Sequence, residues 1–186
     1  MKFIVLLSAI FIFQSELSAQ TLAPVGKTTI YLVRHAEKET GNDPVLTAAG
    51  KKRAGDLMRT LKNKHLQRIY VTQYRRTQMT ADSLRIQFGI DTVHYLADTT
   101  GDDLVEKIKE HNDFGKAILV IGHSNTLAAI IKRLGVTKQP VPVVADNEFD
   151  YLFIVNLTKE KATLTIKRYG TKPVKSATNQ TMQPLQ

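Results

Sequence analysis

The sequence predicts an α/β fold: a three-layer α/β/α sandwich with a mainly parallel central sheet. Short apolar runs rich in β-branched residues alternate with longer, amphipathic segments over residues 27–168. This alternation is typical of parallel strands that are joined by helices covering both faces of a sheet. The chain has 186 residues, of which 42% are hydrophobic, so it is long enough for one domain with a substantial core.

The first half of this region holds two strand and helix pairs. Ile30–Val33 is an unbroken apolar run, which predicts a buried strand. After a Gly-Asn-Asp-Pro turn, Thr47–Lys64 has the apolar spacing of a helix, and Thr47 is its expected N-cap. Arg68–Val71 predicts a second short strand, which leads into a helix over Thr77–Phe88.

The second half continues the alternation and ends in a pair of strands. We expect a weaker strand over Thr92–Leu96, a helix over Asp102–His111, a strand over Ala117–Ile121 and a helix over Asn125–Leu134. Two further apolar runs, Tyr151–Leu157 and Ala162–Lys167, are expected to form a hairpin around residues 159–160.

The two ends of the chain differ in composition from this domain. Lys2, a nearly unbroken apolar stretch over residues 3–13 and small residues at 18–19 predict a signal peptide over residues 1–20, cleaved near Ala19 or Gln20. A retained N-terminal anchor is the alternative, although the stretch is short for a membrane span. Residues 170–186 are rich in Thr, Pro, Gln and Lys and are expected to be disordered. We therefore expect an exported protein, periplasmic or secreted, with no stable membrane span after cleavage.

Composition limits the classes of partner. The chain has no cysteine, which excludes a cysteine-linked lipoprotein and a disulfide-stapled domain. The net charge of +9 favours anionic ligands such as phosphate esters. The basic residues around Lys51–Arg68 have few aromatics between them and fit a solvated helix face, and no known nucleic-acid-binding signature is present. Nucleic acid is therefore not expected as a partner.

Two histidines follow apolar runs at equivalent points. His35, next to Arg34, and His123 each come one or two residues after an expected strand, and Arg76 lies near a helix start after a third. Since the carboxyl ends of parallel strands meet at one edge of a sheet, these side chains are expected to converge. A neutral imidazole is a competent nucleophile, and guanidinium groups bind phosphate oxygens bidentately. The combination predicts a pocket for phosphoryl transfer.

Four motifs occur in order along residues 28–134: Arg34-His35-Ala36-Glu37, Asp43–Gly50, Thr72–Ala81 and Gly122-His123-Ser124. Together they resemble the histidine phosphatase superfamily, also called the phosphoglycerate mutase-like family. The resemblance implies that His35 takes the phosphoryl group and that water then hydrolyses the phosphohistidine. It also implies that Arg34, Arg76 and His123 hold the phosphate, without a metal or another cofactor. Spacing before Thr77 and Ala81 selects Arg76 rather than Arg75.

The leaving group also needs a proton donor. Because family members commonly carry an acidic residue after the next short strand, the resemblance makes Asp98 the first choice as general acid, with Asp102 and Glu37 as reserves. Asn42 and Asn125 are candidate substrate contacts, and a turn residue and a helix cap are their respective alternatives. The other histidines are expected to have structural or surface roles, namely His65, His94 and His111.

The sequence thus predicts a metal-independent phosphomonoester hydrolase acting on a phosphorylated small molecule or an envelope-associated phosphate ester. A phosphomutase is the alternative enzyme, which a short exported chain disfavours. A module of the same fold that binds phosphate or another anionic ligand without turnover is the alternative from a different class. The two histidines with Glu37 or Asp98 are acceptable zinc ligands, but fixed positive charge beside a dication is unfavourable.

Overall fold

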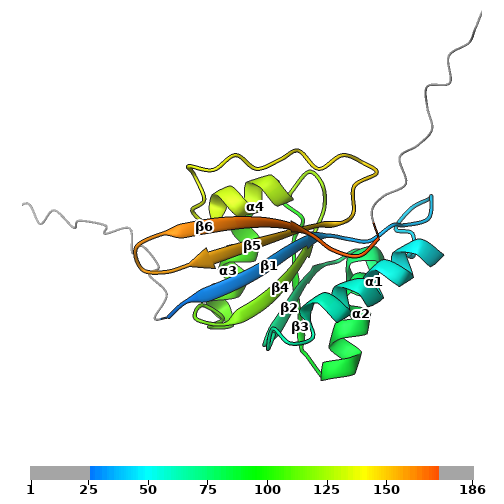
Figure 1. Ribbon diagram of the computed structural model, residues 1–186, viewed down its shortest axis with the longest axis horizontal. Helices are drawn as coiled ribbons and strands as arrows, with labels where there is room; N and C mark the ends of the chain where they lie inside the picture. The colour runs from blue at the N-terminus through cyan, green and yellow to red at the C-terminus, as the bar shows by residue number, and fades with distance from the viewer. Residues whose placement is uncertain (1–25, 172–186) are drawn as a thin grey trace, which may run out of the picture.

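The computed structural model describes residues 26–171, so the expected signal peptide and nearly all of the expected disordered tail lie outside the described residues. Six strands form one sheet in the order β3-β2-β4-β1-β5-β6 (Figure 1). The strands are β1 (Thr28–Arg34), β2 (Arg68–Thr72), β3 (Thr92–Tyr95), β4 (Ala117–Gly122), β5 (Tyr151–Leu157) and β6 (Ala162–Arg168). The first four are parallel, and β5 and β6 are antiparallel to their neighbours, which confirms a mainly parallel sheet.

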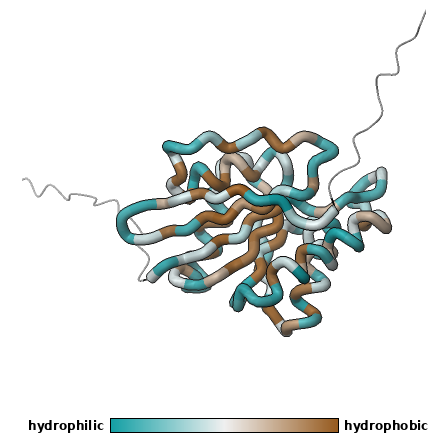
Figure 2. The backbone as a smooth tube through the Cα atoms, viewed as in Figure 1, coloured by the Kyte–Doolittle hydropathy of each residue, from teal (hydrophilic) through white to brown (hydrophobic). Residues whose placement is uncertain are grey.

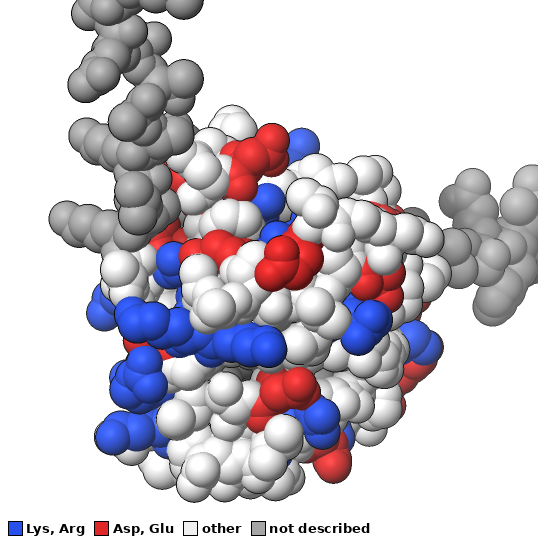
Figure 3. All heavy atoms as spheres, turned by 90° about the vertical axis from the view of Figure 1, so that its right-hand side faces the viewer, with Lys and Arg blue, Asp and Glu red and all other residues white. Residues whose placement is uncertain are grey.

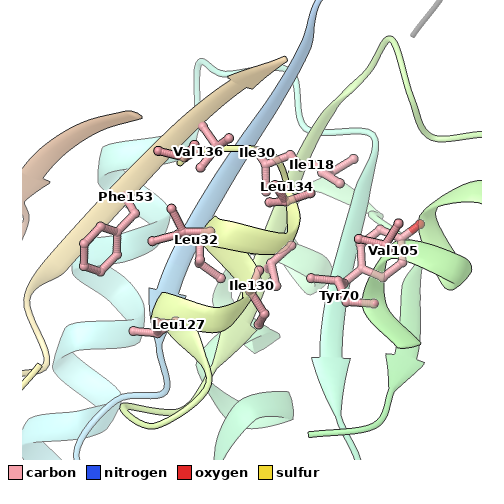
Figure 4. Packing of buried hydrophobic residues seen from close by; sticks show 14 of the residues in the cluster. Ile30, Leu32, Tyr70, Val105, Ile118, Leu127, Ile130, Leu134, Val136 and Phe153 are labelled. Carbon is pink, nitrogen blue, oxygen red and sulfur yellow. The ribbon is translucent and has the colours of Figure 1, made fainter. Parts of the chain in front are cut away.

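Four helices cover the two faces of the sheet: α1 (Ala48–Leu61), α2 (Arg75–Phe88), α3 (Asp102–Glu110) and α4 (Leu127–Arg133). One buried cluster joins α1 and α2 to the sheet, and a larger one joins α3 and α4 to the opposite face. Figure 2 shows the apolar residues concentrated along the central strands. Figure 4 shows how alternate residues of β1, Ile30 and Leu32, meet Ile130 of α4 and Leu134 directly after it in the larger cluster. The predicted three-layer arrangement is therefore confirmed.

The start of α1 agrees with the prediction, whereas the start of α2 differs because a residue from another loop binds it. Thr47 caps α1 as predicted, and its hydroxyl accepts a hydrogen bond from the Gly50 amide at 3.0 Å. Helix α2 begins two residues earlier than predicted, where the Asp43 carboxylate accepts a hydrogen bond from the Arg75 amide at 2.9 Å. This contact from another loop supplies an acceptor for one of the free amides at the helix start. None of the helices within residues 26–171 is long and apolar enough to cross a bilayer.

The parallel register of β1 and β4 sets the position of both strand ends. Val33 pairs with Ile121 and Arg34 with Gly122, so the two strands end side by side. The His35 amide then donates a hydrogen bond to the Gly122 carbonyl at 2.9 Å, which continues the pairing one residue beyond β1. Residues that follow the two strands are thereby brought together at the carboxyl edge of the sheet.

The loop after β1 packs closely against α1 at Gly50. A Cβ atom at this position would lie 2.0 Å from the Glu37 carbonyl oxygen, whereas one at Gly55 of the same helix would meet only the Arg59 side chain at 3.4 Å. Glycine at position 50 is therefore required by the close approach of the two backbones.

We expect Gly50→Ala to lower the free energy of unfolding by about 1–3 kcal/mol, because the loop must move away from α1. Gly55→Ala is the matched control, and it should raise stability by about 0.5–1 kcal/mol because alanine favours a helix. Urea unfolding of both variants measures the difference, and equal stabilities would contradict the close packing described here.

Candidate active site

His35 lies at the carboxyl edge of the sheet, directly after β1, with 3% of its surface exposed. Its Nδ1 is 2.8 Å from the Ala36 carbonyl oxygen, which only accepts hydrogen bonds, so Nδ1 carries the proton. The pKa of His35 is lowered to about 3, mainly by burial; the Ala36 carbonyl opposes this shift, and the neighbouring His123, Arg34 and Arg76 add to it. The imidazole is therefore neutral near pH 7, and Nε2 has a free lone pair.

His123 follows β4, and its ring centroid lies 5.3 Å from that of His35. Its Nε2 is 3.1 Å from the Thr72 hydroxyl, and its Nδ1 faces the Arg76 guanidinium at 3.4 Å. Because a guanidinium only donates, Nδ1 is the acceptor and Nε2–H donates to Thr72. Burial, and next Arg76 and Arg34, lower the pKa of His123 to about 4. Thr72 in turn lies 3.1 Å from the Thr77 hydroxyl, so the imidazole orientation is fixed from α2.

Arg34 is held by the segment that precedes β5. Its Nη1 donates to the carbonyl oxygens of Ala145, Asp146 and Glu148, at 2.8, 3.0 and 3.2 Å. The Phe149 ring lies against the guanidinium, with Cζ 4.1 Å from the ring centroid, and 6.1 Å from the His35 ring. This arrangement orients the cation with neutral dipoles and an aromatic face, so that its positive charge is not cancelled by a carboxylate.

Arg76 comes from the first turn of α2 on the other side of His123. Its Cζ lies 4.1 Å from the centroid of the Tyr74 ring, and the same ring packs edge-on against His123. The carboxylate of Asp43 lies 3.8 Å from Nη1 of Arg76. Each arginine at the site therefore has an aromatic neighbour and retains donor groups for a ligand.

The combined electrostatics favour an oxyanion. The Nε atoms of Arg34 and Arg76 are buried without a hydrogen-bond partner among residues 26–171. Buried donors of this kind are costly unless they are paired, and two cations beside two neutral imidazoles give the site a positive potential. Figure 3, which views the side where β1 ends, shows a band of Lys and Arg side chains crossing this face beside a hollow. The residue types and their charges suit a phosphate group.

Glu37 holds the loop after β1 in place through an ion pair with Arg53. Its carboxylate accepts hydrogen bonds from Nε and Nη2 of Arg53, at 2.6–2.8 Å, and Arg53 is buried on α1. Arg53 also donates to the carbonyl oxygens of Tyr169 and Thr171 after β6. The Glu37–Arg53 pair therefore connects the His35 loop to α1 and to the end of the sheet. Both oxygens of the Glu37 carboxylate, a reserve candidate for the general acid, are hydrogen-bonded to Arg53.

Asp98 lies at the start of α3, where its carboxylate caps the helix. It accepts hydrogen bonds from the amides of Thr100 and Asp103, at 2.9 and 3.0 Å, and from the Gly101 amide. These donors hold the pKa of Asp98 below its ordinary value despite the raising effect of burial. Asp102, the other reserve, pairs with Arg133 on α4. The structure does not bring either carboxylate into contact with the histidines, and the contacts of Asp98 favour a capping role.

No side-chain hydrogen bond or ion pair among residues 26–171 joins the two asparagines or Arg75 to His35 or His123, so the substrate contacts of Asn42 and Asn125 stay predictions. Asn42 and Asn125 are exposed, and neither side chain has a hydrogen bond within the described part of the chain. Thr126, not Asn125, is the N-cap of α4, so the helix begins two residues later than predicted. Arg75 is exposed on α2 and does not join Arg76 beside His123.

Several residues that build the site had no role assigned from the sequence. Asp43 and Tyr74 lie in the recognised motifs without an assigned role, and the others are Arg53 and the segment from Ala145 to Phe149. The position of the segment before β5 follows from the strand pairing. Strand β5 runs antiparallel to β1, and Leu152 near the start of β5 lies opposite Val33 near the end of β1. The residues just before β5 must then lie beside the residues that follow β1.

Within residues 26–171, no group of three or more His, Asp or Glu side chains is placed to hold a metal ion. The side chains around His35 are arginines and neutral imidazoles, and fixed positive charge of this kind suits an anion better than a dication.

A family model and solved structures resemble this chain. Residues 30–98 match the model of the histidine phosphatase superfamily (branch 1). No curated protein sequence matches the chain. A SixA protein from Nakamurella multipartitia has 16% sequence identity and a TM-score of 0.62, over 80% of this chain and 99% of that chain.

Two further structures have the same fold. The protein histidine phosphatase SixA, complexed with tungstate, has 14% identity and a TM-score of 0.58, over 75% of this chain and 96% of that one. A mycobacterial glucosyl-3-phosphoglycerate phosphatase has 14% identity and a TM-score of 0.57, over 77% and 98%. At these identities the likeness establishes the fold. Together with the family match, it confirms the resemblance of this chain to the histidine phosphatase superfamily.

We expect His35 to remain neutral, with the proton on Nδ1, from about pH 8 down to about pH 5, because its pKa lies far below the ordinary value of about 6.5. Long-range ¹H–¹⁵N NMR spectra recorded across this range report both tautomer and charge. Titration of His35 near pH 6.5 would contradict this expectation.

The same pKa values give stability a pH dependence. The unfolded chain binds a proton at each of these histidines below about pH 6.5, whereas folded His35 and His123 do so only near about pH 3 and pH 4. Stability should therefore fall as the pH drops from 7 towards 4, and the fall should be smaller in His35→Gln.

Proposed function

We propose that this protein is an exported, metal-independent phosphomonoester hydrolase that acts through a phosphohistidine intermediate on His35. The observation that carries the proposal is the 2.8 Å contact between Nδ1 of His35 and the Ala36 carbonyl oxygen, which assigns the proton to Nδ1 and leaves Nε2 with a free lone pair. Arg34, Arg76 and His123 around it supply the charge and donors that a phosphoryl group needs. Export rests on the composition of residues 1–20.

Two displacements at phosphorus complete the proposed reaction. In the first, the Nε2 lone pair of His35 forms a bond to phosphorus while the bond to the ester oxygen breaks, and that oxygen takes a proton from a general acid. In the second, water attacks phosphorus and loses a proton to the resulting base, and the electron pair of the N–P bond returns to Nε2. Arg34 and Arg76 neutralise the equatorial oxygens in both steps.

His123 assists by its position between Thr72 and Arg76. Its pKa is low because the ring is buried and lies beside the cations Arg76 and Arg34. A phosphate dianion bound between those cations would raise the pKa of His123 again. The ring then gains a proton more readily and donates a hydrogen bond to a phosphate oxygen. The neutral imidazole of His35 keeps its nucleophilic lone pair because its own Nδ1–H remains bonded to Ala36.

The substrate in this proposal is a phosphorylated small molecule or an envelope-associated phosphate ester. Proteins of the same fold include both a protein histidine phosphatase and a glucosyl-3-phosphoglycerate phosphatase, so the fold accommodates ligands of different size. A chromogenic aryl phosphate is a suitable first probe because its leaving group needs little protonation.

The direct experiment compares the wild type with His35→Ala on p-nitrophenyl phosphate, with and without a chelator. We expect the variant to lose at least about 10³-fold in kcat, because no nucleophile remains, and the chelator to have no effect. Rapid quenching with ³²P-labelled substrate should trap acid-labile phosphate on the wild type only.

Arg59→Gln on α1 serves as the control, since Arg59 pairs with Asp56 on an exposed face. Activity that survives His35→Ala, or that a chelator abolishes, would sink the mechanism. Phosphate binding without turnover by the wild type would instead identify a binding module.

The identity of the general acid is tested by two substrates with different leaving groups. Because the Asp98 carboxylate is ionised and bound to backbone amides of α3, we expect Asp98→Asn to leave the ratio of kcat on p-nitrophenyl phosphate to kcat on β-glycerophosphate unchanged. Asp98→Ala should lower stability by about 1 kcal/mol through the lost cap. A selective loss on β-glycerophosphate in Asp98→Asn would restore this residue as the proton donor.

A further inference from the structure

A hollow lies between α2 and the edge of the sheet, and two of its lining residues, Val71 and Arg75, directly precede Thr72 and Arg76 of the histidine site. It has a volume of about 390 Å³ and is lined by one face of α2 and by the neighbouring strands β2 and β3. The lining residues that carry polar groups on the helix are Arg75, Gln78, Asp82 and Arg85, and Thr92 and His94 face them from β3. The helical residues recur at intervals of three and four, so they form one stripe along α2.

Arg75 gives this hollow its unbalanced charge. Arg85 and Asp82 form an ion pair at 2.7 Å, so their charges offset one another. The Arg75 guanidinium has no ion pair or hydrogen bond with the residues that the structure describes, and its backbone amide alone is held, by Asp43. A cation that lines a polar hollow without a protein partner is suited to an anionic ligand group.

The hollow adjoins the phosphate site through consecutive residues. Arg76 lies 3.4 Å from His123, and Arg75 precedes it on the same helical turn, so their Cα atoms are about 3.8 Å apart. Successive helical side chains diverge by about 100° around the axis, so Arg76 lies beside His123 while Arg75 lines the hollow. Asp43 contacts both residues, since its carboxylate accepts from the Arg75 amide and lies 3.8 Å from Arg76.

We propose that the Arg75 hollow binds a second anionic group of the substrate, at the end opposite the transferred phosphate. The inference rests on the proposed function, and it specifies the substrate class: phosphomonoesters that carry a carboxylate or a further phosphate within the length of a small metabolite. Arg75 is then a specificity-determining residue, because it contacts the part of the substrate that does not react.

The test uses two substrates that differ only at the distal end. 6-Phosphogluconate carries a carboxylate where glucitol 6-phosphate, which is also an open chain, carries a neutral hydroxymethyl group. We expect the wild type to favour 6-phosphogluconate by about tenfold in kcat/KM, as one charge-assisted contact would give, and Arg75→Gln to reduce this ratio to about one. Lys159→Gln, in the turn between β5 and β6 on the opposite edge of the sheet, removes the same charge and should keep the wild-type ratio.

Binding provides a readout that does not need turnover. In NMR titrations, 6-phosphogluconate should shift the ring signals of His94, which lines the hollow, and glucitol 6-phosphate should not. A wild type that hydrolyses p-nitrophenyl phosphate but does not discriminate between the sugar phosphates overturns the inference and leaves the proposed function intact. An equal loss of preference in Lys159→Gln also overturns it. A His94 shift without any hydrolysis would support the anion site while refuting the hydrolase.

Discussion

The register between β1 and β4 is the constraint on which the rest of the site depends. Pairing of Arg34 with Gly122, extended by the hydrogen bond from the His35 amide to the Gly122 carbonyl, places two histidines from distant parts of the chain 5.3 Å apart. A one-residue slip would turn every side chain of β1 to the opposite face and would separate the histidines. The apolar residues on both faces of β1 resist such a slip, because each face belongs to a different buried cluster.

The pocket combines buried cations with neutral imidazoles, and that combination determines its chemistry. Neither Arg34 nor Arg76 is neutralised by a bidentate carboxylate: carbonyl oxygens hold Arg34, and Asp43 lies 3.8 Å from Arg76. The same positive field and burial keep His35 unprotonated, which a nucleophile requires. By contrast, the buried Arg53 is fully paired with Glu37 and serves to fix the His35 loop. Position in the fold therefore separates the two arginines that we propose bind the phosphate from the structural one.

Much of the fold and the core of the pocket were predictable from the sequence because they depend on local patterns. Each expected strand and helix is present, and the strand-end positions of His35 and His123 follow from the apolar runs before them. Contacts between distant segments were not predictable. The carbonyl oxygens around Arg34 come from a loop without regular structure, and every residue has a backbone carbonyl, so no residue type in the sequence identifies the ones that bind Arg34. The role of Asp98 was not decided by the sequence for a related reason: an acidic residue before a helix has the same pattern whether it binds the helix amides or donates a proton.

The most direct test is a crystal structure of the protein with tungstate, a tetrahedral oxyanion that resembles phosphate. We expect one ion within hydrogen-bond distance of Arg34, Arg76 and His123, with its central atom in line with Nε2 of His35. Binding should pair the buried Nε atoms of both arginines. An ion bound elsewhere on the basic surface, with the two histidines unoccupied at saturating tungstate, would contradict this expectation.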